Sequence, residues 1–435
     1  MSDQDAYPHK YNKLRSIYNY YIDSYIALYQ LKTETEEELM SIFKMIKTEL
    51  IDSNKHPPQN IIKDILNIIP YNNRYTKSYL LLAKLISDEY HIKEVNKITT
   101  ISNFLFYKEY GIKLDKSDDF EKKIIGNLDI HTENTIYRTI MNNDKERFIA
   151  FTEMEGFDKN QKFYSEFYPD YNGKLYSLLE LCCYHGAVDC FKLLRTKFNS
   201  EITETCLEFS FLGGNQEIMS ECLKYQKPDY TCMEYAIISH NIDFVTFLMN
   251  EYNIKIDLEY CGKYKNLDSF LVYFDQTNDI DKCFVYSVMF NIPSLLEYLL
   301  SHGANINKKD QIRRTALHFA AHYNYKEIAE VLISHGANIN VRDRIGRTAL
   351  YYSVCYKSKE LLELLISHGA KINEKNVLGD TALHIAACKN YKEIAEVLIS
   401  HGANINERGR TALYIAESIK SKELFELLTS HGAKK

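Results

Sequence analysis

The stretch RTALHFAAHYNYKEIAEVLISHGANIN, residues 314–340, decides how the C-terminal part of this chain folds. Thr315 has the side chain of a helix N-cap, and the small apolar residues after it recur at a spacing that suits close helix packing. Asn324 tolerates the left-handed backbone of a tight turn, and Gly336 is placed to end a second helix in that conformation. The stretch therefore predicts two helices joined by a turn and followed by an extended connection.

The pattern recurs at a fixed period. The tetrapeptide Ser-His-Gly-Ala occurs five times; its histidines at positions 302, 335, 368 and 401 are 33 residues apart, and position 431 follows after 30. A second motif, Thr-Ala-Leu followed by His or Tyr, keeps a similar period from Thr315 onward. The units that begin at Thr315 and Thr381 share a longer sequence, so the full period is about two repeats. Such self-similarity indicates stacked units that bury their faces only against neighbours.

These units resemble the ankyrin repeat, whose pattern is a turn, Thr-Pro-Leu-His-x-Ala-Ala, a second helix and a closing Gly-Ala-Asp-hydrophobic-Asn. Here Ala replaces Pro, and the family histidine is present at His318 and His384 but is tyrosine in the other two units. The glycine of the connecting finger is present at Gly346 and Gly379, but Arg313 takes its place in the first clear unit, which disfavours an ideal turn there. The resemblance implies an all-α, ankyrin-type solenoid of helix-turn-helix repeats with short β-hairpin fingers.

Weaker copies extend the array upstream. Helix pairs align at 136–158 and from Ser177, Thr205 and Thr231, and the last two spacings, 28 and 26 residues, leave no room for a finger. The 51 residues between Thr231 and Lys282 hold either an insertion or one decayed repeat. In the final unit, the finger before Thr411 is three residues shorter than the one before it, which predicts a stunted hairpin.

The N-terminal region, which we call the leader (residues 1–125), has apolar and aromatic residues at helical spacing and is predicted to pack onto the first repeats. Thr33 and Glu36 have the spacing of a capping box, and Pro58 is placed at a helix start. The predicted domains are the helical leader, 1–125; divergent ankyrin-like helix pairs, 126–281; and regular repeats ending in a short-finger terminal repeat, 282–435.

The composition disfavours several functional classes. A formal charge of −6 argues against a general nucleic-acid binder, although the fingers themselves are basic. No apolar run reaches the roughly 18 residues that a membrane-spanning helix needs, and no signal peptide is apparent. The ten cysteines include no Cys-x-x-Cys pair, so we interpret them as reduced and mostly buried thiols. These features predict an intracellular protein, in the cytoplasm or the nucleus.

The sequence predicts no enzyme, no cofactor and no metal site. It contains no phosphate-binding loop, metalloprotease motif or nucleophile elbow. Stacked helices lie about 10 Å apart, whereas metal ligands lie about 2 Å from one ion, so the recurring histidines are too far apart to share a metal. We expect each of them to lie at a helix C-terminus, near free carbonyl groups. We expect His318 and His384 to form hydrogen bonds with neighbouring loop backbone.

The residues that vary between units are the candidates for function. Basic finger tips beside an aromatic edge on the first helix of each pair have the composition of a protein interface. This predicted concave surface comprises Arg313, Arg314, Phe319, His322, Tyr323, Arg342, Arg344, Arg347, Tyr352, Tyr356, Lys375, Ile385 and Lys389. Arg408 and Arg410 continue the basic character into the last finger.

The sequence therefore predicts a non-catalytic scaffold or adaptor that binds another protein with an acidic or mixed surface. The alternative is a targeting subunit whose leader carries an enzymatic or complex-recruiting activity. The partner, the oligomeric state and the number of degenerate repeats between residues 126 and 281 are left open at this stage.

Overall fold

The computed structural model describes residues 8–53, 56–120, 132–169, 173–407 and 411–434. The chain divides into two compact units, Met1–Asp275 and Gln276–Lys435. Helices dominate both, and the two strands found in the described residues, β1 (Lys162–Phe163) and β2 (Tyr176–Ser177), form one short antiparallel pair. The predicted all-α class is confirmed, while the domain boundaries predicted after residues 125 and 281 stay predictions.

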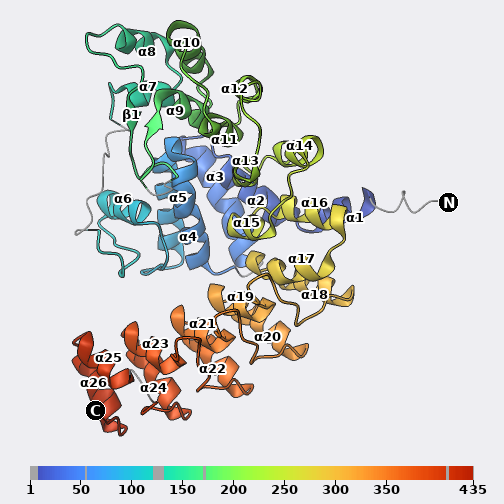
Figure 1. Ribbon diagram of the computed structural model, residues 1–435, viewed down its shortest axis with the longest axis vertical. Helices are drawn as coiled ribbons and strands as arrows, with labels where there is room; N and C mark the ends of the chain where they lie inside the picture. The colour runs from blue at the N-terminus through green and yellow to red at the C-terminus, as the bar shows by residue number, and fades with distance from the viewer. Residues whose placement is uncertain (1–7, 54–55, 121–131, 170–172, 408–410, 435) are drawn as a thin grey trace, which may run out of the picture. The chain divides into compact units, whose positions relative to one another are not determined.

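The second unit is a stack of helix pairs that step side by side in Figure 1. Its described residues form α17 (Ile280–Ser287) with α18 (Pro293–Ser301), α19 (Ala316–Tyr323) with α20 (Lys326–Ser334), α21 (Ala349–Cys355) with α22 (Lys359–Ser367), α23 (Ala382–Cys388) with α24 (Lys392–Ser400), and α25 (Ala412–Ser418) with α26 (Lys422–Ser430). A single 3-10 turn, η6 (Val288–Phe290), follows α17. We call the first helix of each pair helix one.

Each of these pairs turns on a residue with left-handed backbone, φ between 56° and 58°: Asn291, Asn324, Lys357, Asn390 and Lys420. Gly336 has φ 83° directly after α20, and its N–H donates to the Ile333 carbonyl at 3.0 Å. The predicted roles of Asn324 and Gly336 are therefore confirmed, because both positions need the conformation that glycine and asparagine tolerate best.

The repeated asparagine of the closing motif joins neighbouring units. Asn340 Oδ1 accepts from the Lys371 N–H at 2.8 Å, and its Nδ2 donates to the Gly369 carbonyl at 3.1 Å. Asn373 makes the same two bonds one unit later, to Asn404 and Gly402. The recurring Asn thus forms two hydrogen bonds with the backbone that follows the second helix of the next unit.

The fingers are hairpin-like turns without assigned strands among the described residues. The Asp343 N–H donates to the Arg347 carbonyl at 2.9 Å, and successive fingers are joined by Arg344 N–H to Ile312 O at 2.8 Å. Arg313 adopts φ 65° in place of the glycine, so the turn forms despite the substitution. Residues 408–410 lie outside the described residues, and the stunted last hairpin stays a prediction.

The first unit contains five more helix pairs in its described part, over the residues where the sequence predicts divergent repeats. They are α7 (Ile136–Met141) with α8 (Lys145–Thr152), α9 (Leu178–His185) with α10 (Val188–Phe198), α11 (Glu204–Gly213) with α12 (Gln216–Cys222), α13 (Tyr230–Ile238) with α14 (Ile242–Tyr252), and α15 (Leu258–Lys263) with α16 (Leu267–Thr277). The interval after Thr231 holds a further helix pair, α15 with α16, and its descent from an ankyrin repeat stays a prediction.

The leader is helical, as predicted. Its elements are α1 (Pro8–Ile17), α2 (Asn19–Tyr29), α3 (Glu36–Met45) continued by the π-helical η2 (Ile46–Asp52), α4 (Pro58–Ile68), the 3-10 turns η3 (Ile69–Tyr71) and η4 (Asn73–Tyr75), α5 (Thr76–Glu89) and α6 (Thr100–Tyr110). The capping box predicted between Thr33 and Glu36 is wrong: the helix begins at Glu36, Thr35 is its N-cap, and the Thr35 N–H donates to Thr33 Oγ1 at 3.1 Å.

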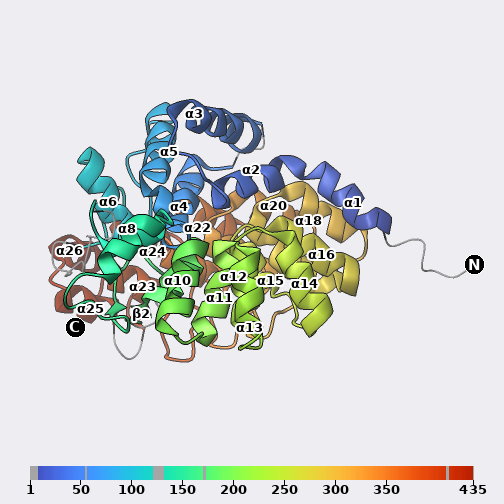
Figure 2. The ribbon, with the colours of Figure 1, turned by 90° about the horizontal axis from the view of Figure 1, so that it is seen from above.

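The leader packs along the divergent pairs as far as α16, further than the first repeats that the sequence suggested. The Tyr11 hydroxyl donates to Asp268 Oδ1 at 2.6 Å, and the Lys10 ammonium lies 3.6 Å from the centroid of the Phe274 ring, so α1 lies against α16 (Figure 2). Further along, the Tyr184 hydroxyl of α9 donates to the Pro70 carbonyl at 2.8 Å.

Candidate protein-binding surface

The finger tips of the second unit carry a row of exposed apolar side chains. Ile312, Ile345, Val377 and Leu378 are 37, 43, 65 and 81% exposed. The fingers that carry them are joined by the Ile312–Arg344 bond and by Val377 N–H to Ile345 O at 2.9 Å, so the row is continuous. We call these four residues the tip row. Neighbouring exposed apolar groups on one surface are typical of interaction sites, whereas isolated ones are not.

Two of the predicted basic residues are structural. Arg314 Nε pairs with Asp310 at 2.6 Å and Arg347 Nε with Asp343 at 2.8 Å, and the Arg347 guanidinium lies 4.6 Å from the centroid of the Tyr352 ring. Burial would raise the pKa of Asp343, but hydrogen bonds from Arg347 and Tyr352 outweigh burial and lower it. These contacts fix each finger against its own helix one.

The predicted aromatic edge is partly covered. Phe319 and Tyr352 are 3 and 4% exposed, under Arg314 and Arg347, so their rings support the surface from beneath. His322 is half-buried, with its ring centroid 4.3 Å from that of Tyr356. The half-buried Tyr323 and Ile385 and the exposed Lys389 complete the predicted edge. Whether a partner contacts any of these residues stays a prediction.

The remaining basic finger residues differ in their availability. Arg342 pairs with Glu374 at 3.5 Å, and Lys375 pairs with Glu407 at 2.8 Å. Arg313 and Arg344 are exposed, and neither has an ion-pair partner among the described residues. Arg408 and Arg410 lie outside the described residues. The available cations are therefore those directly beside the tip row.

The histidines have structural roles of the kind predicted. His318 Nδ1 accepts from the Thr315 N–H at 3.0 Å, which leaves Nε2 to donate to the Arg347 carbonyl at 3.1 Å in the next finger. Burial lowers the pKa of His318, consistent with a neutral ring. His335, at the end of α20, has its Nδ1 2.8 Å from the Val331 carbonyl. No group of three or more metal-ligating side chains occurs in the described part of the chain.

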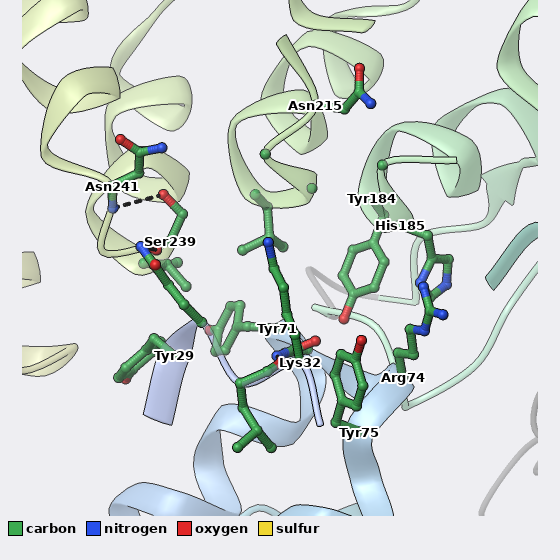
Figure 3. Close-up of a pocket in the computed structure, with 18 of the residues that line it drawn as sticks. Tyr29, Lys32, Tyr71, Arg74, Tyr75, Tyr184, His185, Asn215, Ser239 and Asn241 are labelled. Carbon is green, nitrogen blue, oxygen red and sulfur yellow. Dashed lines mark hydrogen bonds between the residues drawn. The ribbon is translucent and has the colours of Figure 1, made fainter. Parts of the chain in front are cut away.

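The first unit has a cavity of about 430 Å³ between the leader and the inter-helix turns of the divergent pairs (Figure 3). Lys32 and Arg74 are the lysine and arginine that line it, beside tyrosines that include Tyr71 and Tyr184, and its described lining contains no aspartate or glutamate. Figure 3 shows the Lys32 side chain extending into this space. An activity of the leader, the alternative function, stays a prediction.

The surface predicted from the sequence does not include the four tip-row residues. The signal was present: each apolar side chain occupies the tip of a turn, where polar residues are the norm. The aspartates at 310 and 343, which hold the arginines, were also recognisable as residues recurring five positions before a helix N-cap.

Comparison with known protein families matches two separate parts of the chain. Residues 284–376 and 372–435 match the family model described as ankyrin repeats (3 copies). Residues 198–273, from the end of α10 into α16, match a domain of unknown function, DUF3447. The search of curated proteins found no match to the chain. Among the described helices, none combines the length and the hydrophobicity needed to cross a bilayer.

Proposed function

We propose that this chain, an ankyrin-repeat protein with a helical leader, is a non-catalytic scaffold that binds a partner protein on the tip row and the adjoining edge of helix one. Ankyrin repeats are protein–protein interaction modules, and such arrays present their variable residues on the fingers and on helix one. The residues on this surface, rather than the fold, determine which partner is bound.

The observation that carries the proposal is the tip row with two available arginines beside it. Fully burying an exposed leucine-sized side chain contributes roughly 1.5–3 kcal/mol. The four side chains of the tip row, 37 to 81% exposed, would each contribute a part of this on binding and together provide a sizeable apolar contact. Arg313 and Arg344 flank the row and favour carboxylates on the partner. The partner we propose is a protein surface with an apolar centre and an acidic rim.

The test uses the full-length chain as bait, with Ile345→Asp and Leu378→Asp combined. Partners captured from cells by the unmodified chain are identified, purified and titrated against both proteins. The double variant is expected to bind at least about tenfold more weakly, with an unchanged circular dichroism spectrum and melting temperature. Ile419→Asp is the matched control, because Ile419 is 40% exposed but lies in the turn between α25 and α26. Binding unaffected by the double variant would place the site elsewhere.

A further inference from the structure

The divergent repeats carry a second cavity, of about 350 Å³, on helix one of two neighbouring pairs, α11 and α13. The regular repeats have their fingers at the N-terminal end of helix one, but here only short links precede the helices: five residues separate α10 from α11, and seven separate α12 from α13. No finger therefore flanks the cavity at the N-terminal ends of α11 and α13, and a ligand can reach it there.

Aromatic rings form the walls of the cavity. They belong to Tyr176, Phe209, Tyr230, Tyr235 and Tyr260. Phe209 packs against Tyr176 and Tyr235, with ring centroids 5.1 and 5.5 Å apart, whereas Tyr230 is 73% exposed at the rim. The faces of such rings carry partial negative charge and attract cations.

Two carboxylates, Glu208 and Glu234, line the same space. Glu234 is 5% exposed, and its Oε1 accepts from the Tyr264 hydroxyl at 3.0 Å. Burial and the neighbouring Glu234 raise the pKa of Tyr260 to about 12, so that hydroxyl is also a neutral neighbour. Burying a carboxylate has a desolvation cost, and a cation that enters the cavity beside it would offset this cost.

Glu208, the other carboxylate of the lining, is half-buried. Burial raises its pKa, while the positive charge of Lys174 opposes that shift. Lys174 is the cation in the lining; its ammonium donates to Thr205 Oγ1 at 2.6 Å and lies 5.8 Å from the centroid of the Tyr176 ring. The chain therefore already places one of its own ammonium groups at the edge of this cavity.

We propose that this cavity, the acidic cage of Tyr176, Glu208, Phe209, Tyr230, Glu234 and Tyr260, binds a lysine side chain of a partner protein. The ammonium would lie between the carboxylates and the ring faces, and the methylene chain would pack against Tyr230 at the rim. The Lys263 ammonium lies 4.6 Å from the centroid of the Tyr264 ring and 5.8 Å from that of the cage residue Tyr260, so rings at this place already attract an ammonium group. The inference does not depend on the tip row, because it concerns a different surface in the other unit.

The test is ligand-observed saturation-transfer NMR on the full-length chain, with Nα-acetyl-lysine amide as the probe. We expect transfer to the side-chain methylenes of this probe. Its Nε-acetylated analogue, which has lost the charge, is expected to give none. Glu208→Gln combined with Tyr230→Ala should weaken binding about tenfold or more. Lys174→Met should strengthen it about threefold, because an internal competitor is removed.

The matched control combines Glu204→Gln and Tyr225→Ala. Both residues are exposed and neither lines the cage, and Glu204 is in the first turn of the same helix as Glu208. This control should bind the probe as the unmodified chain does. Equal binding of the acetylated analogue, or affinity unchanged by both Glu208→Gln and Lys174→Met, would overturn the proposal. If the double variant is unstable, the single changes at Glu208 and Lys174 give the same test with opposite expected signs.

Discussion

Two turns of the first unit are buried, whereas the equivalent turns of two pairs in the second unit are exposed. His240 and Lys265 turn the divergent pairs α13/α14 and α15/α16 with φ 52° and 59°, and they are 6 and 4% exposed. Asn324 and Lys357 turn two regular pairs with φ 58° and 56°, and both are exposed. The backbone is therefore equivalent, and the difference lies in what covers it.

The leader is the cover in the first unit. The Tyr29 ring stacks on His240 with centroids 4.2 Å apart, and Gln30 Nε2 donates to the His240 carbonyl at 3.0 Å. The His240 ring itself lies 2.8 Å, through Nε2, from the Tyr264 carbonyl of the next turn. Turns between paired helices can thus form contacts with another part of the same chain. Side chains at the turn position, such as His240, make these contacts.

The largest expected effect is a loss of stability of the first unit in acid. Burial lowers the pKa of His240 to about 4, and burial together with the charge of Lys265 lowers the pKa of His56 to about 4. Because these values lie below the unfolded pKa of about 6.5, the unfolded chain binds more protons, and stability falls as the pH drops below about 6.5. At pH 5 each histidine is expected to cost on the order of 2 kcal/mol.

Urea unfolding at pH 7 and pH 5, followed by hydrogen exchange resolved along the chain, measures this loss. The leader and the divergent pairs should lose protection first. His240→Asn, which keeps a residue that tolerates left-handed backbone, should remove about half of the pH dependence. An equal loss of protection at pH 5 in the regular repeats and in the first unit would contradict the predicted role of the buried histidines.

A second prediction concerns how closely the fingers of the regular repeats stack. A Cβ at Gly346, φ 80°, would lie 2.8 Å from Arg342 Nη2 and 3.1 Å from the Asn376 Cα of the next finger. Gly346→Ala is therefore expected to destabilise the second unit by about 3 kcal/mol, from left-handed backbone and from overlap. Gly379→Ala is the matched control, since φ is 85° but a Cβ there meets nothing within 4 Å among the described residues. Equal losses of urea midpoint for the two variants would rule out close stacking as the cause.

The smallest expected effect is a gain in the stability of the second unit. Arg313 holds φ 65° where other fingers have glycine, so Arg313→Gly should stabilise the second unit by about 0.5–1 kcal/mol. The same change at Arg344, whose φ is not positive, should give no gain. Thermal unfolding compares the two variants. Because Arg313 is also an available cation beside the tip row, its loss should weaken partner binding while raising the melting temperature, which separates the two roles.

The repeat period allowed much of the regular array to be predicted. Each unit contacts only its neighbours, so the structural roles of Asn324 and Gly336 can be predicted from about 33 residues of sequence. The leader's docking has no such signal, because a contact such as Tyr11 with Asp268 joins residues 257 positions apart. The burial of Phe319 and Tyr352 was also hidden, since it depends on arginines that fold back onto the rings instead of projecting into solvent.

The most direct measurement is amine acetylation of the full-length chain, read by mass spectrometry at three lysines that share one turn position. Lys357 and Lys420 are exposed, and Lys265 is 4% exposed. Burial lowers the pKa of Lys265, which by itself would speed its acetylation. We expect Lys265 to react at least about tenfold more slowly than Lys357 and Lys420, because local opening must precede reaction, and Tyr29→Ala to raise its rate. Equal rates at the three lysines would contradict the account that the turn between α15 and α16 is covered within the first unit.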